Sequence, residues 1–386
     1  LKLLAILIWI TSLCNEFNVE NKMSDDILKK ISIEDMENIA LGGAFLGTGG
    51  GGDPYIGKLM AEQAIQKNGP VPVLNVDDIP DDGLVVPVAM MGAPTVMLEK
   101  LPQGDEAISA LESLQSYLGK KTDAVFCIEA GGLNSTIPIA VAAQAKLPIV
   151  DGDGMGRAFP ELQMVSMTMH NIKACPMVMA DEKGNSLVLN TVDNLSTEKF
   201  ARVITVEMGG VGLIALYPMT GAEAKKSILR GSLSLINNIG RIIHSEQKEN
   251  RNPANFLKEK LSGTILFEGR VMDVDRRTEG GFARGSCRII GLEKYNGQEV
   301  SLEFQNEFLL AKSKEGNPIA MTPDLICLLD LETGQPITTE QIRYGFRVLV
   351  FGLSCDPQWR TKHGLELVGP KYFGYDYEYT PIENLN

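Results

Sequence analysis

The sequence predicts a layered α/β N-terminal domain with a mostly parallel sheet, followed by a mostly β C-terminal domain of barrel or sandwich form. Segments typical of strands and helices alternate as far as about Asn171, which indicates an α/β sheet. From Gly263 onward, short strands follow one another with turn residues between them. We therefore divide the chain into an extension at 1–22, a glycine-rich-loop domain at 23–171, and a C-terminal domain at 172–386 that begins with helices and continues with strands.

The composition indicates a globular protein, and we expect a small-molecule substrate and no nucleic-acid partner. Hydrophobic residues make up 44% of the chain and charged residues 22%, which is ordinary for a globular domain. The net charge of -13 repels phosphate backbones, so we expect no nucleic-acid partner. The six cysteines form no C-x-x-C pair and the three histidines lack metal-binding spacing. The sequence thus predicts no disulfide scaffold, and we assign no metal ligands.

An apolar run at 3–13 precedes Met23, which opens a segment that looks like a natural start. The run is too short for a normal membrane span, and no clear small-residue cleavage site follows it. We expect 1–22 to be an upstream extension that makes few contacts with the body of the protein, with a real signal peptide as the alternative. Together with the unpaired cysteines, this favours a cytoplasmic protein that does not associate with membranes.

Local signals place the elements of the N-terminal domain. Ser32 and Asp35 predict a capping box, and Asp53 followed by Pro54 predicts a helix that ends at Gly69. The remaining segments follow from hydrophobic runs and amphipathic spacing. The expected helices are 32–40, 54–67, 105–118 and 138–145, and the expected strands are 71–76, 84–90, 124–128 and 148–150.

After about Asn171 the pattern of expected helices and strands changes. A turn around Asp181 predicts a hairpin of the strands 177–180 and 187–189. Helices are expected at 196–206 and 221–244. Alternating aromatic residues near the C-terminus, from Tyr372 to Tyr379, suit an edge strand or a subunit contact, so we expect a homo-oligomer.

A glycine run at 47–52 matches the pattern G-x-G-x-x-G, but a helix rather than a strand is expected before it. Leu59 stands where a phosphate-binding loop requires Ser or Thr, so we reject ATP binding. One interpretation is a turn that caps the following helix. We favour the other, in which bare backbone amides bind an anionic group of a ligand. The residues expected to do so are Gly49, Gly50, Gly51 and Gly52.

Acidic residues follow two of the expected strands. Glu129 comes directly after the strand 124–128, and Asp151 and Asp153 follow the strand 148–150. Because ligands gather at the carboxyl ends of parallel strands, we expect these carboxylates to converge on one cleft. Arg157 should point into the same cleft. The alternative is an aspartate turn with a salt bridge along one helix face.

Five stretches of the chain carry a resemblance to a known family. They are LGGAFLGTGGGGDPY, EAGGLNS, DGDGMGRAFPELQM, FEGRVMDVDRRTEGGFARGS and VGPKYFGYDYEY. Together they resemble the S-methyl thiohydantoin desulfurase family over roughly 31–379. The resemblance implies an α/β domain followed by a β domain, and an enzyme that hydrolyses an S-methyl thiohydantoin to a hydantoin and methanethiol. It also implies association with hydantoinase/oxoprolinase-type proteins, and the alternative is a noncatalytic subunit of such a complex.

This reaction requires an acid and a base but no redox cofactor, so we expect none. The expected acid/base set is Glu129, Asp151 and Asp153. Arg157 would anchor a substrate carboxylate or ring carbonyl, while Asn134 and Ser135 would bond polar atoms of the ring. Cys127 offers a covalent alternative, but it lies in an apolar strand without a nearby histidine and is expected to be core. His170 is a second candidate base, although a lone histidine beside an apolar run is more often structural.

Overall fold

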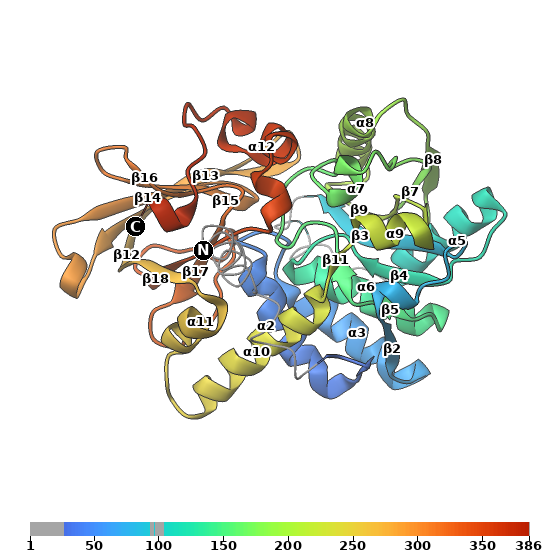
Figure 1. Ribbon diagram of the computed structural model, residues 1–386, viewed down its shortest axis with the longest axis horizontal. Helices are drawn as coiled ribbons and strands as arrows, with labels where there is room; N and C mark the ends of the chain where they lie inside the picture. Colours follow the sequence, from blue (N-terminus) through green and yellow to red (C-terminus); the bar gives the residue numbers. More distant parts are fainter. Residues whose placement is uncertain (1–26, 93–95, 97–103, 386) are drawn as a thin grey trace, which may run out of the picture.

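The computed structural model describes residues 27–92, 96 and 104–385 and folds them into two domains that lie side by side (Figure 1). The N-terminal domain contains a mixed sheet with helices on its faces, and the C-terminal domain contains a seven-stranded antiparallel sheet. This confirms the predicted fold class. The expected extension at 1–22 lies outside the described residues.

The sheet of the N-terminal domain is parallel on one side and antiparallel on the other. The strands β2, β5, β4 and β3 pair in parallel, in that order, and β9, β7 and β8 continue the sheet beyond β3 with antiparallel pairing. The bounds are β1 (Lys30–Ile31), β2 (Val71–Leu74), β3 (Leu84–Gly92), β4 (Ala124–Cys127), β5 (Ile149–Val150), β7 (Met177–Ala180), β8 (Ser186–Leu189), β9 (Val211–Ala215) and β10 (Met219–Thr220).

The α/β unit therefore continues beyond residue 171, where we expected it to end. Seven of the nine residues of β3 are completely or almost completely buried apolar residues, and an unpaired edge on such a strand would leave buried backbone groups without partners. Strand β9 covers this edge, and β7 and β8 pair onto β9. The predicted hairpin of β7 and β8 is confirmed, but it belongs to the first sheet.

Helices cover both faces of this sheet and link it to the second domain. The predicted capping box at Ser32 and Asp35 is confirmed, and Asp53 caps the next helix by accepting from the Tyr55 N–H at 2.9 Å. The α-helices are α2 (Met36–Leu46), α3 (Pro54–Asn68), α5 (Glu106–Leu118), α6 (Gly132–Ala145), α7 (Ser166–Met169), α8 (Asn194–Glu207), α9 (Gly221–Ser227), α10 (Ser232–Lys248), α11 (Ala254–Leu261) and α12 (Lys362–Val368). Short 3-10 turns are η2 (Ile33–Asp35), η3 (Val76–Asp78), η4 (Glu293–Tyr295), η5 (Pro357–Arg360), η6 (Pro370–Phe373) and η7 (Ile382–Asn384).

Three helix predictions were wrong in their bounds. The helix expected at 138–145 begins earlier, as α6 at Gly132, so that Pro138 lies inside it and not at its start. The helix expected to end at residue 40 continues as α2 to Leu46, because the glycines there serve helix packing: a Cβ at Gly42 would lie 1.8 Å from the carbonyl oxygen of Ile236 in α10. The helix expected at 221–244 is divided into α9 and α10. Between them β11 (Leu229–Arg230) pairs with β6 (Gly152–Asp153).

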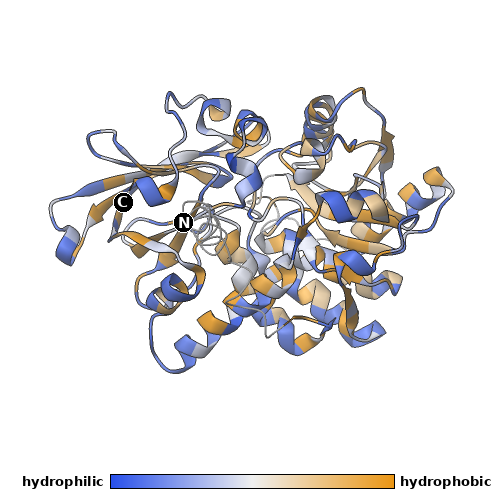
Figure 2. Ribbon diagram, in the orientation of Figure 1, coloured by the Kyte–Doolittle hydropathy of each residue, from blue (hydrophilic) through white to orange (hydrophobic). Residues whose placement is uncertain are grey.

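The C-terminal sheet packs one face against the first domain and the other in a core of its own. Cys327 and Leu329 share the main core with the N-terminal domain, whereas Ile326 and Leu328 belong to the second core, as the two-residue alternation of a strand requires. Figure 2 shows hydrophobic residues concentrated on the strands of the first sheet. The strands are β12 (Thr264–Glu279), β13 (Phe282–Gly291), β14 (Glu299–Gln305), β15 (Glu307–Ser313), β16 (Pro318–Met321), β17 (Leu325–Asp330) and β18 (Arg347–Leu353).

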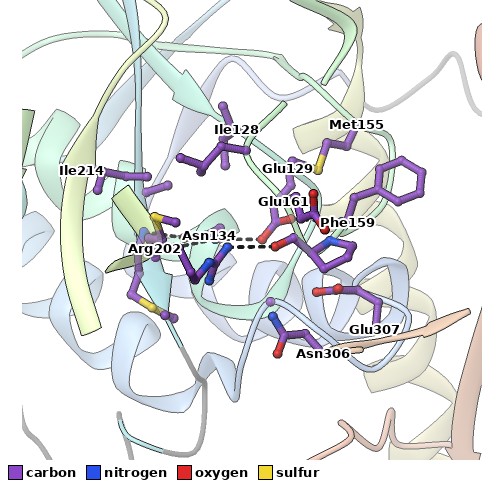
Figure 3. A pocket seen from close by; sticks show the side chains of 17 residues that line it. Ile128, Glu129, Asn134, Met155, Phe159, Glu161, Arg202, Ile214, Asn306 and Glu307 are labelled. Atoms are coloured by element: carbon purple, nitrogen blue, oxygen red, sulfur yellow. Dashed lines mark hydrogen bonds between the residues drawn. The ribbon is translucent and has the colours of Figure 1, made fainter. Parts of the chain in front are cut away.

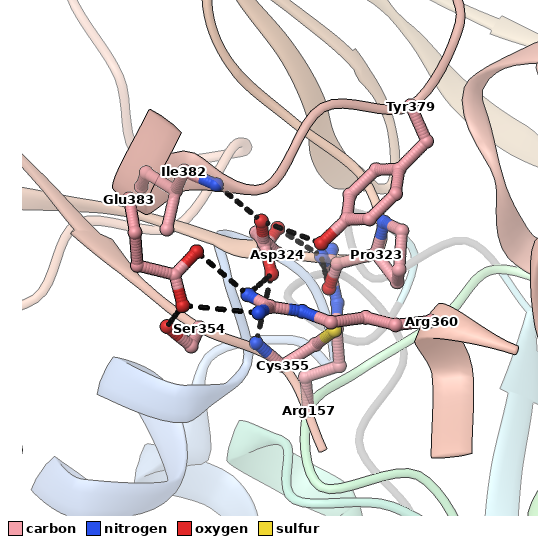
Figure 4. A network of polar contacts seen from close by, with 9 residues as sticks. All are labelled: Arg157, Pro323, Asp324, Ser354, Cys355, Arg360, Tyr379, Ile382 and Glu383. Atoms are coloured by element: carbon pink, nitrogen blue, oxygen red, sulfur yellow. Dashed lines mark hydrogen bonds and ion pairs between the residues drawn. The ribbon is translucent and has the colours of Figure 1, made fainter. Parts of the chain in front are cut away.

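A buried aspartate holds the C-terminal segment in place. Asp324 is completely buried, and Figure 4 shows the groups that surround its carboxylate. It accepts hydrogen bonds from four donors: the N–H of Cys355 and of Ile382, the guanidinium of Arg360 and the hydroxyl of Tyr379, at 2.8 to 2.9 Å. Of the two expectations for the tyrosine-rich segment, the edge strand was wrong. The segment is the turn η6 followed by an irregular stretch, which hydroxyl contacts and not strand pairing attach to the domain.

Candidate active site

A cleft lies where the two domains meet, at the carboxyl ends of β3 and β4 (Figure 3). The space free of protein atoms in it, with its open mouth, is about 510 Å³. The first domain lines the cleft with β3, the residues after β4, the loop 155–162 and one side chain of α8, and the second domain contributes Asn306 and Glu307. In α/β sheets, ligands typically bind at this edge.

Glu129 is one of the three carboxylates that we expected in this cleft, and it lines the cleft. Only 5% of it is exposed. The Asn134 side-chain amide donates to its Oε1 at 2.7 Å, and the Phe159 N–H donates to its Oε2 at 3.3 Å. Burial raises the pKa of Glu129 to about 7, although these two hydrogen bonds act to lower it. A carboxylate with this pKa is suited to accept a proton near neutral pH.

Glu307 is a second acidic residue of the cleft, and it was not among the residues predicted from the sequence. It opens β15 in the C-terminal domain and is 2% exposed, and among the described residues its Oε2 has no hydrogen-bond partner. Burial, followed by the nearby charge of Glu129, raises the pKa of Glu307 well above its usual range. The sequence did contain a sign of it, since Glu307 begins the apolar run EFLLA, and a buried carboxyl is costly unless it serves a function.

Two glycines of the run, Gly50 and Gly51, pack against Glu307. A Cβ at Gly50 would lie 2.0 Å from the Oε1 of Glu307, and the Gly51 backbone hydrogen-bonds this carboxyl. Gly51 has a φ of +69°, and it alone of the four predicted glycines lines the cleft. The loop thus binds an acidic group, as its bare amides suggested, but the group belongs to the protein itself.

Asp151 and Asp153 lie nearby but do not line the cleft. Asp151 accepts from the N–H and the hydroxyl of Ser234, at 3.0 and 2.6 Å. Asp153 accepts from the Ser232 hydroxyl at 2.5 Å and from the Gly156 N–H at 2.7 Å, and burial raises the pKa of Asp153 to about 6. The backbone N–H groups in the first turn of α10 have no acceptor within the helix, and the Asp151 carboxylate accepts from one of them. Although β4 and β5 are neighbours, only the carboxylate after β4 faces the cleft.

Arg157 does not point into the cleft, contrary to our expectation. It is completely buried, and its guanidinium donates five hydrogen bonds of 2.8 to 3.1 Å, to acceptors in both domains. The acceptors are the Thr48 hydroxyl and the carbonyl oxygens of Ala158, Phe308, Pro323 and Asp324. A guanidinium has five N–H donors, so none remains for a substrate.

The two remaining predicted ligands of the substrate differ in position. Asn134 lines the cleft, where its amide also bonds the backbone of Met90 in β3, at 2.8 Å as acceptor and 3.2 Å as donor. It therefore fixes Glu129 relative to β3. Ser135 lies outside the lining, and its hydroxyl accepts from the Gly131 N–H at 3.1 Å.

The sequence also missed Arg202, which extends from α8 into the cleft (Figure 3). It donates to Glu198 at 2.7 Å and to the carbonyl oxygen of Pro160 at 3.1 Å, and it lies 4.1 Å from the ring centre of Phe282. Among the described residues that line the cleft, Arg202 is the one cation. It would provide a counter-charge for an anionic or carbonyl group, the role that we had expected of Arg157.

The alternative nucleophile and base are not in the cleft. Cys127 is completely buried in β4, where burial raises the pKa of its thiol well above the usual range, so it is unsuited to form a thiolate. His170 follows the short helix α7 and does not line the cleft. Within 27–92, 96 and 104–385, no group of three or more acidic, cysteine or histidine side chains is arranged to hold a metal ion. None of the helices in these ranges has the length and apolar character needed to cross a membrane.

The fold and the cleft define a two-domain protein in which buried acidic side chains from both domains meet at the carboxyl edge of a mixed sheet. The chain belongs to the S-Me-THD-like family, which confirms the resemblance to S-methyl thiohydantoin desulfurases. The model of the family's N-terminal domain matches residues 34–191, and that of its C-terminal domain matches residues 192–382.

One solved structure supports the assignment of the fold. A crystal structure of a protein from Chromobacterium violaceum is similar to this chain with a TM-score of 0.76 and 25% sequence identity, over 92% of this chain and 99% of that one. A comparison with curated proteins found no match.

Proposed function

We propose that the protein hydrolyses a small S-methyl thiohydantoin, releasing methanethiol and leaving a hydantoin. The observation that carries the proposal is the meeting of Glu129 and Glu307 in one cleft, each buried and each with a raised pKa. Pairs of acidic groups in different protonation states are typical of acid–base catalysis. Membership of the family supports the choice of substrate.

In the first step, water attacks the ring carbon that carries the methylthio group. Ionised Glu129 takes one proton from this water, and protonated Glu307 donates its proton to the ring nitrogen of the C=N bond. The product of this step is a neutral tetrahedral intermediate that bears both a hydroxyl and the methylthio group. Glu129 is the better base because its carboxylate is oriented by Asn134 and Phe159, whereas Glu307 has the more strongly raised pKa.

In the second step, the intermediate collapses and the C–S bond breaks. The hydroxyl becomes the carbonyl of the hydantoin, and its proton returns to Glu307. Methanethiolate takes the proton held by Glu129 and leaves as methanethiol. Both side chains are then in their starting states, so the reaction requires no further reactant than water.

The function is tested by incubating the purified protein with an S-methyl thiohydantoin in water enriched in oxygen-18. We expect methanethiol, detected with a thiol reagent, and one labelled oxygen in the hydantoin carbonyl. If the folded protein releases no thiol alone but does so when a hydantoinase-type protein is added, the proposal of an independent enzyme is wrong. The chain would then be the noncatalytic subunit that the sequence left open.

The proposed roles predict how the rate depends on pH. Glu129 must be ionised and has a pKa of about 7, so kcat/KM should rise as the pH increases through about 7. Glu307 must be protonated, and its pKa is raised well above its usual range, so the rate should fall only at higher pH, where it loses its proton. Initial rates measured between pH 5 and 10 check this prediction. A kcat/KM that already falls as the pH rises through 7 would contradict a mechanism that requires ionised Glu129.

A further inference from the structure

Helix α8 has an unusual distribution of polar and apolar side chains. Its inner face carries the buried ion pair of Glu198 and Arg202, with 5% and 10% of the side chains exposed. Its outer face and Val192, two residues before the helix, expose five apolar side chains beside Lys199 and Glu207. The outer residues are Val192 (81% exposed), Val203 (63%), Phe200 (57%), Val206 (52%) and Leu195 (43%). Several exposed apolar side chains on one face of a helix are typical of a protein–protein interface.

We propose that two copies of this chain associate through this outer face of α8, with the two helices antiparallel about a two-fold axis at Val203. The order of residues around Val203 supports a second copy as the occupant. Lys199 and Glu207 are equally distant from Val203 along the helix, on opposite sides, and both are exposed. The axis therefore places each Lys199 opposite the Glu207 of the other copy, which forms two interchain ion pairs.

The apolar residues obey the same symmetry. Phe200 and Val206 are also equally distant from Val203, so each Phe200 packs against the Val206 of the other copy, and the two Val203 side chains meet on the axis. A surface that is complementary to itself in both charge and shape is a requirement of a two-fold interface. An unrelated partner would not require the pairs of Lys199 with Glu207 and of Phe200 with Val206.

The interface lies directly behind one wall of the cleft. Glu198 accepts from the N–H of Leu162 at 2.9 Å, and Arg202 donates to the carbonyl oxygen of Pro160 at 3.1 Å. Association would thus hold the helix that positions these cleft-lining residues. This link to the cleft rests on the proposed function, whereas the interface itself does not.

The area of the outer face of α8 determines how tightly we expect the two copies to associate. A single pair of helices buries less area than the roughly 1,200 Å² of a stable interface, so we expect a dimer that dissociates on dilution into about the micromolar range. Sedimentation velocity of the full chain, of 42.0 kDa, should show a monomer–dimer equilibrium at tens of micromolar. A wild-type protein that remains monomeric there overturns the proposal and leaves the face to a different partner.

Charge reversal tests the arrangement itself. Lys199→Glu and Glu207→Lys each place like charges opposite one another, so each should shift the protein to monomer, and the double variant should restore the dimer. Val203→Asp should abolish it. Tyr344→Asp is the matched control, because Tyr344 is 71% exposed in the other domain and should not affect association. A dimer that persists in Val203→Asp, or a double variant that remains monomeric, contradicts the proposed geometry whether or not the protein releases methanethiol.

Discussion

Glu129→Gln should lower kcat for methanethiol release by about 100-fold or more and change KM little. The substitution keeps the shape of the side chain and its contact with Asn134, but a carboxamide cannot take a proton from water. The loss therefore falls on the step in which water attacks. Steady-state kinetics at pH 8, where Glu129 is ionised, give the largest difference from the wild type.

The matched control is Glu340→Gln. Glu340 is also a buried glutamate, 2% exposed, and burial raises its pKa to about 7, but it does not line the cleft. We expect this variant to retain wild-type kcat. Equal losses in Glu129→Gln and Glu340→Gln would mean that both act through the fold and would remove Glu129 from the mechanism.

Stability provides a second control for Glu129→Gln. The pKa of Glu129 is raised in the folded protein, so its contribution to stability is present below the ordinary pKa of 4.5 and is lost as the pH rises through about 7. At pH 8 the wild type therefore contains a buried, ionised carboxylate that the amide replaces. The amide also loses one acceptor, because its single oxygen cannot serve both Asn134 and Phe159. We therefore expect a urea midpoint close to that of the wild type, and a loss of turnover at an unchanged midpoint is not due to unfolding.

Local signals in the sequence were sufficient for the fold class and for several element bounds. Asp53 with Pro54 marked the start of α3, and the turn at Asp181 marked the β7–β8 hairpin. The sequence could not show that this hairpin joins the first sheet, because strand pairing between distant segments leaves no local pattern. Nor could it show that Gly42 lies within a helix, since the reason is the close approach of α10.

Residues of the candidate site could be predicted from the sequence only where they directly follow a strand of the sheet. Glu129 met that condition because it comes immediately after β4. Asp151 met the same condition, because it directly follows β5. It does not line the cleft, because its carboxylate accepts hydrogen bonds from Ser234 in the first turn of α10. Glu307 belongs to the other domain, so its approach to Glu129 depends on how the two domains pack. The glycine loop suggested an anion site, but only the three-dimensional structure shows that Glu307 occupies it.

Arg157→Met should destabilise the protein by several kcal/mol, because each buried acceptor left without a donor costs about 1–3 kcal/mol. The guanidinium connects Thr48 of the first domain to the carbonyl oxygens of Phe308, Pro323 and Asp324 of the second. Methionine fills a similar volume but leaves these buried acceptors without donors. Lysine should also destabilise the protein, because a single ammonium cannot reproduce five hydrogen bonds in a fixed plane.

Trp359 reports directly on this region. It is completely buried, donates to the Met155 carbonyl oxygen at 2.8 Å, and lies edge-on to Phe159, on which Arg157 stacks at 4.7 Å. Urea unfolding followed by its fluorescence, with Trp9→Phe removing the other tryptophan, should show a lower midpoint in both Arg157 variants. Arg251→Met is the control, since Arg251 is 59% exposed and its ion pair contributes little. An Arg157→Lys variant with an unchanged midpoint and only a raised KM would instead return this arginine to substrate binding.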